Sequence, residues 1–369
     1  MQKSLLEYFE EIKDPRSDRN KKHPLEMLIG TTLLAFLCGI DSFSGIEAFV
    51  EGHEEELAKY FDFPGGVPSH DTYQRLWDQI RPEEFVDAFH SFTASIVTIP
   101  QEMSLVSIDG KTIRNSGKEK PLHIVSAWCE ANQMVIAQHK VKAKSNEITA
   151  IPELLKLLDL HERIVTVDAI GAQREICTQI VQQGGDYLIA IKGNQGNLHQ
   201  DIKDYFKDSE LLEQADSYTD ITKGHERIEQ RTAYVIDDIQ WLINTHQWPS
   251  LRSIGIIVST VTKKEKTYTE NRFYISSLDR NAERFNKAAR AHWGIENKLH
   301  WRLDVVFNED KSCIRNDNAS ENIAIMRKWA LNVIQKIKDK PEQSLKGIMR
   351  KNCMSFKHLI KSLSKIFHA

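Results

Sequence analysis

The sequence of 369 residues predicts an α/β fold, in which a helical N-terminal domain precedes a mixed sheet with a β-rich insertion. Three observations lead to this fold class. Helical patterns dominate residues 1–95, three strand-like runs with hairpin character follow, and helix-like and strand-like segments then alternate. This order is typical of a mixed α/β sheet. We therefore expect a helical domain over residues 1–95 and an α/β domain over residues 96–369.

The N-terminal domain is predicted from helices separated by a break. Leu28–Leu37 forms an apolar helix and Gly45–Phe61 an amphipathic one, after which FPGGVP interrupts helical structure. A further helix begins at Ser69 or Asp71, either of which suits an N-cap. This arrangement matches a DNA-binding helix-turn-helix, but packing of a helical subdomain explains it equally well. The nearby basic residues that favour DNA contact are Arg16, Arg19, Lys21 and Lys22.

The sheet is predicted from short apolar runs rich in β-branched residues. The predicted strands are Leu105–Asp109, His123–Cys129, Met134–Val141, Ile164–Asp168 and Tyr187–Ile191, and the predicted helices are Thr149–Leu158 and Gln173–Gln182. Asp109 and Asp168 would then lie on neighbouring central strands. In open α/β sheets, polar sites gather near the carboxyl ends of such strands.

The segment between Asp168 and Glu296 is far longer than a connection from sheet to helix requires. Within it, EQRTAYVID, SIGIIVSTVT and TENRFYISSL are typical of strands, so we expect a β-rich insertion over about residues 200–280. A basic helical tail is expected over about residues 335–369. It contains nine Lys or Arg residues against Asp339 and Glu342, and its candidate contacts to a DNA backbone are Lys346, Arg350 and Lys351.

Composition limits the class of protein. The net charge of −3 is a weak argument against nucleic-acid binding, and the locally basic tail offsets it. Five scattered cysteines without a Cys-x-x-Cys pair predict reduced thiols in a cytoplasmic protein and argue against structural zinc. The apolar stretch Leu25–Ile40 contains Glu26 and is shorter than the ~20 residues that span a bilayer. We therefore expect no membrane segment.

Three acidic residues stand in surroundings that are unusual for surface charge. Asp109 follows SLVSI, Asp168 follows RIVTV, and Glu296 lies in the aromatic-rich helical segment RAHWGIENKLHWRLD. Each aspartate alone is compatible with an ordinary turn or helix cap. Together they predict a carboxylate cluster that needs a shared proton or cations, because two such charges about 4 Å apart repel by roughly 4 kcal/mol. Hard oxygen ligands favour Mg²⁺ or Mn²⁺.

Six segments occur in an order and with a spacing that resemble a known family. They are SIDGKTIRNSG, KSNEITAIPELL, VTVDAIGAQ, IAIKGNQGNL, GHERIEQR and HWGIENKLHWRLDVVFNED. The chain resembles the ISAs-type insertion-sequence DDE transposases, the group that includes the H-repeat-associated proteins, from about Asp14 to about Asn318. The resemblance implies a ribonuclease-H-like core with a catalytic, metal-binding triad of Asp109, Asp168 and Glu296.

The resemblance also implies metal-dependent DNA strand cleavage at the ends of a mobile element and strand transfer into target DNA. We expect two Mg²⁺ or Mn²⁺ ions, with Asp109 bridging both, Asp168 holding one and Glu296 the other. The expected partner is double-stranded DNA, both element ends and target, bound by a homodimer in the bacterial cytoplasm at the nucleoid. The alternatives are a nuclease or resolvase that does not join DNA, and a catalytically idle DNA-binding remnant.

Basic and polar residues near these carboxylates are candidate contacts to DNA phosphates. Many related transposases carry Tyr and Arg before the catalytic Glu and Lys after it, where this chain has Ala289, His292 and Leu303. Arg290 and His292 are therefore the candidates on that helix. The other candidates, which follow predicted strands, are Lys111, Arg114, Lys192 and Asn194.

Overall fold

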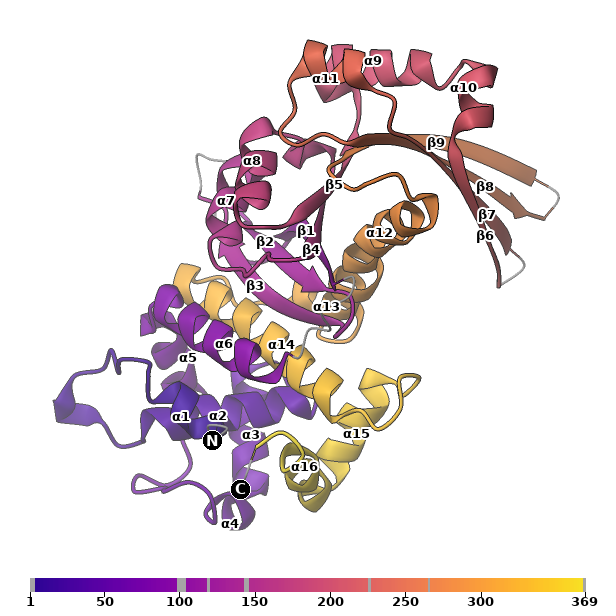
Figure 1. The fold of residues 1–369 in the computed structure, drawn as a ribbon. Coiled ribbons are helices and arrows are strands. Elements are labelled where there is room, and N and C mark those ends of the chain that lie inside the picture. Colours follow the sequence, from indigo (N-terminus) through magenta and orange to yellow (C-terminus); the bar gives the residue numbers. More distant parts are fainter. Residues whose placement is uncertain are drawn as a thin grey trace.

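The protein folds into two lobes in the computed structural model, which describes residues 4–97, 104–117, 120–142, 146–224, 227–264 and 266–367. His225 and Glu226, from the segment GHERIEQR, lie outside that description. One lobe holds a long sheet with helices on both faces, and the other is helical (Figure 1). Both ends of the chain lie in the helical lobe (Figure 1).

The helical lobe combines the two ends of the sequence in one core. Trp329 is fully buried against four phenylalanine rings from the N-terminal helices, with ring centroids 5.1–5.8 Å apart. The predicted boundary at residue 95 therefore does not separate two cores, because the tail predicted over residues 335–369 packs with the N-terminal helices. The helices of this lobe are α1 (Leu5–Phe9), α2 (Leu25–Leu37), α3 (Phe43–Gly52), α4 (Glu54–Leu57), α5 (His70–Gln79), α6 (Pro82–Ile96), α14 (Asp317–Ile337), α15 (Leu345–Met354) and α16 (Phe356–Leu363).

The predicted N-terminal helices are present with shifted ends. The helix predicted over Gly45–Phe61 is divided into α3 and α4, because the backbone of His53 leaves the helical region between them. α2 is buried on almost all sides, as its predominantly apolar sequence predicts. α5 begins after Ser69 and packs against α3 and α14, as a helical subdomain requires. No helix in the described parts of the chain is long and apolar enough to cross a membrane.

The other lobe is built on one nine-stranded sheet with the order β3-β2-β1-β4-β5-β9-β8-β7-β6. The pairs β1–β2 and β2–β3 are antiparallel, whereas β1–β4 and β4–β5 are parallel. This arrangement confirms the predicted mixed sheet and the neighbouring positions of the two aspartate strands. The strands are β1 (Ser104–Ile113), β2 (Leu122–Cys129), β3 (Met134–Lys140), β4 (Arg163–Val167), β5 (Asp186–Ile191), β6 (Asp216–Gly224), β7 (Arg227–Ile236), β8 (Ser253–Lys263) and β9 (Lys266–Ser276).

The β-rich insertion continues the main sheet. β9 pairs antiparallel with β5, and β8, β7 and β6 follow outward, each antiparallel to its neighbour. The prediction of three strands missed β6, whose residues alternate between half-buried and exposed because it lies at the edge of the sheet. Its polar sequence DSYTDITKG therefore lacks the apolar signal of the inner strands. The short helices between β5 and β8 are α9 (Gly196–Tyr205), α10 (Ser209–Gln214) and α11 (Gln240–His246).

The two faces of β1 contact different layers. Val106 and Ile108 belong to the core beneath α7 (Glu147–Leu155) and α8 (Arg174–Gln182). The alternate residues face the long helical segment on the other side of the sheet (Figure 1). That segment consists of α12 (Ala282–Gly294), the π-helical turn η4 (Ile295–His300) and α13 (Trp301–Val305).

Candidate active site

Asp109 lies inside β1 and not at its end. The parallel pairing with β4 stops at Ile108, but the antiparallel pairing with β2 continues to Ile113, so the strand predicted to close at Asp109 extends four residues further. One carboxylate oxygen of Asp109, Oδ1, accepts the N–H of Gly110 at 2.9 Å. The other, Oδ2, lies 3.7 Å from Nδ1 of His300. Asp109 is therefore placed where β1 and β4 diverge, between the sheet and the η4 turn.

Asp168 directly follows β4 and caps the short 3₁₀ turn η2 (Ala169–Gly171). Its Oδ1 accepts the N–H groups of Ile170 at 3.0 Å and Gly171 at 3.2 Å. A side chain at position 171 has no room, because a Cβ there would lie 2.1 Å from Cγ1 of Val167. The turn thus fixes the direction of the Asp168 carboxylate at the carboxyl end of β4, and the ordinary capping role coexists with a place in the site.

Glu296 lies in the π-helical turn η4. Single π turns within α-helices occur frequently at functional sites, because the extra residue redirects the side chains around it. The turn is held at the sheet by an ion pair of Lys298 with Glu130 and by a hydrogen bond from Arg302 to Gln133 at 2.9 Å. The exposed carboxylate of Glu296 consequently lies in a turn that is held in its middle and just after its C-terminal end.

All three predicted acids line one cavity of about 190 Å³ at the carboxyl ends of β4 and β5. Burial, and then the charges of Asp168, Glu147 and Glu296, raise the pKa of Asp109 to about 7, against the hydrogen bond from Gly110. Burial also raises the pKa of Asp168, against the hydrogen bond from Gly171. The cavity therefore concentrates negative charge in surroundings that disfavour it, which is the electrostatic setting of a cation site.

The donor chemistry of this cavity fits a hard divalent cation. Carboxylate oxygens are the preferred ligands of Mg²⁺ and Mn²⁺. In the parts of the chain that the structure describes, no three His, Cys, Asp or Glu side chains already stand arranged to hold an ion. The three acids are brought to the same cavity without forming a closed coordination shell.

The candidates Lys192 and Asn194 follow β5 at the same edge of the sheet. Lys192 is exposed and lines the cavity, and its charge opposes the rise in the pKa of Asp168. Nδ2 of Asn194 donates to the carbonyl oxygen of Ala169 at 2.5 Å. Asn194 thus joins the loop after β5 to the turn that carries Asp168, and Lys192 places a positive charge at the same cavity.

Lys111 does not reach this cavity. Its Nζ donates to Asp304 at 2.7 Å, Glu309 at 2.7 Å and Asp310 at 3.3 Å. An ammonium group has three N–H donors, and these carboxylates use all of them. The phosphate contact predicted for Lys111 stays a prediction, and in this structure the strand directs the side chain toward α13 and away from the cavity. Arg114 is 83% exposed, with its Nε 3.4 Å from Asp310.

The two candidates on α12, His292 and Arg290, lie in different surroundings. His292 lines the cavity, and its Nδ1 lies 3.2 Å from the hydroxyl of Thr166. Burial lowers the pKa of His292 to about 4, so at neutral pH it offers a hydrogen bond and no charge. Arg290 forms an ion pair with Asp220 of β6 and lines a smaller adjacent depression.

The basic tail residues lie far from this cavity. Lys346, Arg350 and Lys351 are exposed on α15, in the helical lobe. α15 lies at the end of the molecule opposite the insertion strands (Figure 1). The structure therefore does not bring these candidates together with the acidic cluster.

Glu147 and His123 lie beside the three acids, and the sequence prediction did not include them. Oε1 of Glu147 lies 2.8 Å from Nε2 of His123, and the charge of Glu147 raises the pKa of both Asp109 and Asp168. A Cβ at position 110 would lie 2.3 Å from this carboxylate, so the glycine after Asp109 makes room for Glu147. The available signal was KSNEITAIPELL, which carried the family resemblance without an assigned role.

Comparison with known proteins places the chain in a class that agrees with this geometry. The family model described as Transposase DDE domain matches residues 100–333, and the model described as DDE_Tnp_1-associated matches residues 6–93. The chain belongs to the Transposase DDE domain family. Within it, two similar Escherichia coli K12 proteins are named "Putative protein YbfL", 40% identical, and "H repeat-associated putative transposase YhhI", 39% identical. Each alignment spans 98% of both chains.

Among solved structures, the chain is similar to a piggyBac transposase from a synaptic complex with hairpin DNA. The TM-score is 0.45 at 12% sequence identity, and the alignment covers 98% of this chain and 80% of that one. A likeness of this size adds no weight to the family assignment, which rests on the sequence matches.

Proposed function

We propose that this protein cleaves DNA strands at the ends of a mobile element and joins them to target DNA. The observation that carries the proposal is the convergence of Asp109, Asp168 and Glu296 on one cavity from three distant segments. The strand order β3-β2-β1-β4-β5, with β1, β4 and β5 parallel, supports a ribonuclease-H-like core. The partner in this proposal is double-stranded DNA, bound by a homodimer in the cytoplasm.

The three acids would hold two Mg²⁺ or Mn²⁺ ions, which supply an activated water or DNA 3′-hydroxyl and stabilise the leaving oxygen. Asp109 lies deepest, between the sheet and η4, and would contribute a carboxylate ligand to the ions. Lys192 would attract and position a phosphate as a point charge. His292 would orient a ligand through a hydrogen bond, because it stays neutral near pH 7.

The test is a cleavage and joining assay on element-end DNA with Mg²⁺ and a target plasmid. We expect joined products from the wild type, and none from Asp109→Asn, Asp168→Asn or Glu296→Gln at unchanged DNA affinity. Excess chelator should abolish activity. The control is Glu283→Gln. It removes an exposed glutamate of α12, which is paired with Lys287 of the same helix.

The products separate the alternatives. Nicked DNA without joined product would support a nuclease or resolvase, and a gel shift without cleavage would support an idle DNA-binding protein. Wild-type rates in any of the three acid variants would contradict the assignment of that residue.

A further inference from the structure

Alternate residues of β1 contact successive positions of the helical segment that carries Glu296. Residues two apart on a strand share a face, so Ser107, Asp109 and Lys111 all point toward that segment. The three contacts are Ser107 Oγ to the carbonyl oxygen of Ala291 at 3.2 Å, Asp109 Oδ2 to His300 Nδ1 at 3.7 Å, and Lys111 Nζ to Asp304 Oδ1 at 2.7 Å. β1, which carries Asp109, and the helical segment that carries Glu296 are thus joined on both sides of the site.

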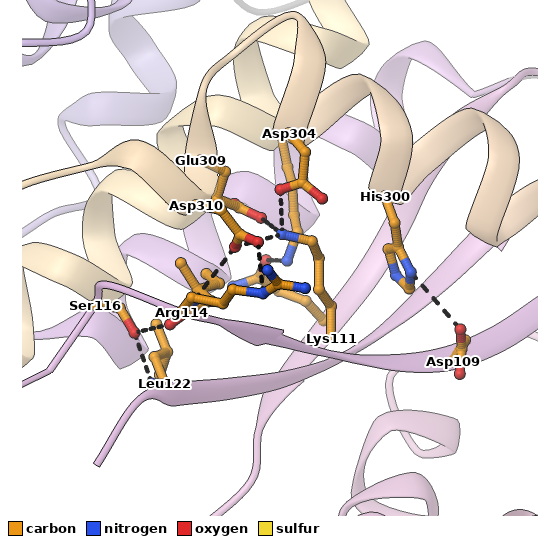
Figure 2. A network of polar contacts seen from close by, with 12 residues as sticks. Asp109, Lys111, Arg114, Ser116, Leu122, His300, Asp304, Glu309 and Asp310 are labelled. Atoms are coloured by element: carbon orange, nitrogen blue, oxygen red, sulfur yellow. Dashed lines mark hydrogen bonds and ion pairs between the residues drawn. The ribbon is translucent and has the colours of Figure 1, made fainter.

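The contact at Lys111 is the strongest of the three. Its side chain is 12% exposed, and one of its partners, Glu309, is 1% exposed. Figure 2 shows the lysine ammonium surrounded by Asp304, Glu309 and Asp310, with Asp109 further along the same strand. Charge-assisted hydrogen bonds in buried surroundings are short and directional, so they hold their partners in one geometry.

The turn that supplies two of these carboxylates is itself attached to β1. Glu309 and Asp310 belong to η5 (Glu309–Lys311). Oδ1 of Asp310 accepts the backbone N–H of Arg114 at 3.2 Å, and the carbonyl oxygen of Asp310 accepts Nδ2 of Asn115 at 2.7 Å. Lys111 is therefore the centre of a fixed junction between β1, α13 and η5, outside the catalytic cavity.

We propose that Lys111 is a positioning residue that holds Asp109 at its working distance from the Glu296 turn. The proposal rests on the proposed function, because that function requires carboxylates from β1 and η4 to share cations. Lys111 follows Asp109 by two residues, and Asp304 follows Glu296 by eight, so a shift at the junction is transmitted along both elements to the site. DNA does not contact Lys111 in this proposal, because its three donors are already used.

The experiment compares Lys111→Met with Lys140→Met. Lys140 also joins a strand to a helix, through Glu321 at 2.7 Å, but its partner is α14 and not the Glu296 segment. We expect the half-activating Mn²⁺ concentration for cleavage to rise 10- to 100-fold in Lys111→Met, with DNA affinity changed less than twofold. Lys140→Met should leave both quantities as in the wild type.

A second variant keeps the test valid if Lys111→Met does not fold. Removing the lysine leaves buried carboxylates unpaired, so Lys111→Met/Glu309→Gln removes the most buried one as well. Two readouts need no turnover: the rise in unfolding temperature on adding Mn²⁺, and the crystallographic distance from Asp109 Oδ2 to His300 Nδ1. We expect a smaller rise in this variant and a distance longer than 3.7 Å.

The outcomes distinguish the two proposals. A folded double variant with wild-type Mn²⁺ response and an unchanged Asp109–His300 distance would overturn the positioning role of Lys111. A wild-type protein that neither cuts DNA nor responds to Mn²⁺ would instead overturn the metal-dependent function. In that case the crystallographic distance in the double variant still decides the role of Lys111.

Discussion

At the scale of single residues, the fold disfavours the negative charge of Asp109, although the proposed chemistry requires that charge. Burial and three neighbouring carboxylates raise its pKa from 3.8 to about 7, so the cation-free protein carries a carboxyl group that resists ionisation. A bound divalent ion would favour the charged form. A bound divalent cation would therefore remove this local cost.

This electrostatic cost predicts a pH-dependent gain in stability for Asp109→Asn. The folded protein holds the Asp109 proton more tightly than the unfolded chain, so wild-type stability falls between about pH 4 and pH 7. The variant lacks this loss, and its advantage should grow across that range, level off above it, and stay below about 4 kcal/mol. Urea unfolding at several pH values without metal measures it. An advantage that shrinks with rising pH would contradict the cause given for the shift.

Lys192 makes a second prediction at this scale. It lines the same cavity as the three acids, so Lys192→Ala should slow single-turnover cleavage at least tenfold at saturating metal. DNA affinity should fall less, because one phosphate contact is a small share of a large footprint. The control is Lys203→Ala, an exposed lysine on α9. Equal, small losses of rate and affinity would place Lys192 outside the catalytic machinery.

At the scale of elements, β1, the turn after β4 and η4 carry the three acids, and the start of α7 lies beside them. α7 begins at Glu147, whose carboxylate binds His123 of β2 and lies against Gly110. Thr112 contacts the other ring nitrogen of His123 at 2.7 Å. α7 is thereby joined to the β1–β2 hairpin beside Asp109, and it adds a fourth carboxylate to the electrostatic field of the site.

The position of Glu147 predicts a catalytic effect without a loss of fold. Glu147→Gln keeps the shape and a hydrogen-bonding atom for His123 but removes one negative charge. We expect a 10- to 100-fold drop in cleavage rate at low Mg²⁺, partly restored at high Mg²⁺, as for partners that orient metal ligands. The control is Glu153→Gln, an exposed residue of the same helix paired with Lys156. A Mg²⁺ dependence identical to that of the wild type would limit Glu147 to a structural role.

At the scale of the whole molecule, the acidic cavity and the basic helices belong to different lobes. The exposed residues Lys346, Arg350 and Lys351 of α15, with Lys357 of α16, form a basic surface on the helical lobe. The cavity is lined by residues of the sheet lobe and of the helical segment that carries Glu296. If a DNA duplex reached both lobes, the helical lobe would bind its backbone and the sheet lobe would cleave it.

This separation predicts that binding and chemistry can be changed independently. Replacing the four basic residues of this surface by alanine should weaken binding to all DNA sequences. It should also lower the slope of log K against log salt by up to about 0.9 for each lost phosphate contact. Cleavage at saturating protein should stay near the wild-type rate. Lys156→Ala/Lys207→Ala, which removes exposed lysines already paired with neighbouring acids, is the control. An unchanged salt slope would mean that DNA does not follow this surface.

The sequence predicted most of the elements because the inner strands and helices carry strong apolar periodicity. It misjudged elements whose pattern depends on distant neighbours. β6 has the composition of a loop and becomes a strand only because β7 offers it a partner. From the sequence alone, Lys111 is expected to be a solvated cation that follows a predicted catalytic aspartate. In the structure, η5 and α13 bring three carboxylates to it from about 200 residues away in the sequence.

The sequence by itself determined the family and the mixed sheet and predicted the three acids, because these depend on local runs of residues and their order. The tertiary structure decided which residues share an environment. It joined the C-terminal helices to the N-terminal ones through Trp329, because their apolar faces need partners that neither segment has alone. It also brought Glu147 beside Asp109 and removed Lys111 from the site, since the pairing of β1 with β2 and β4 fixes which way each side chain points.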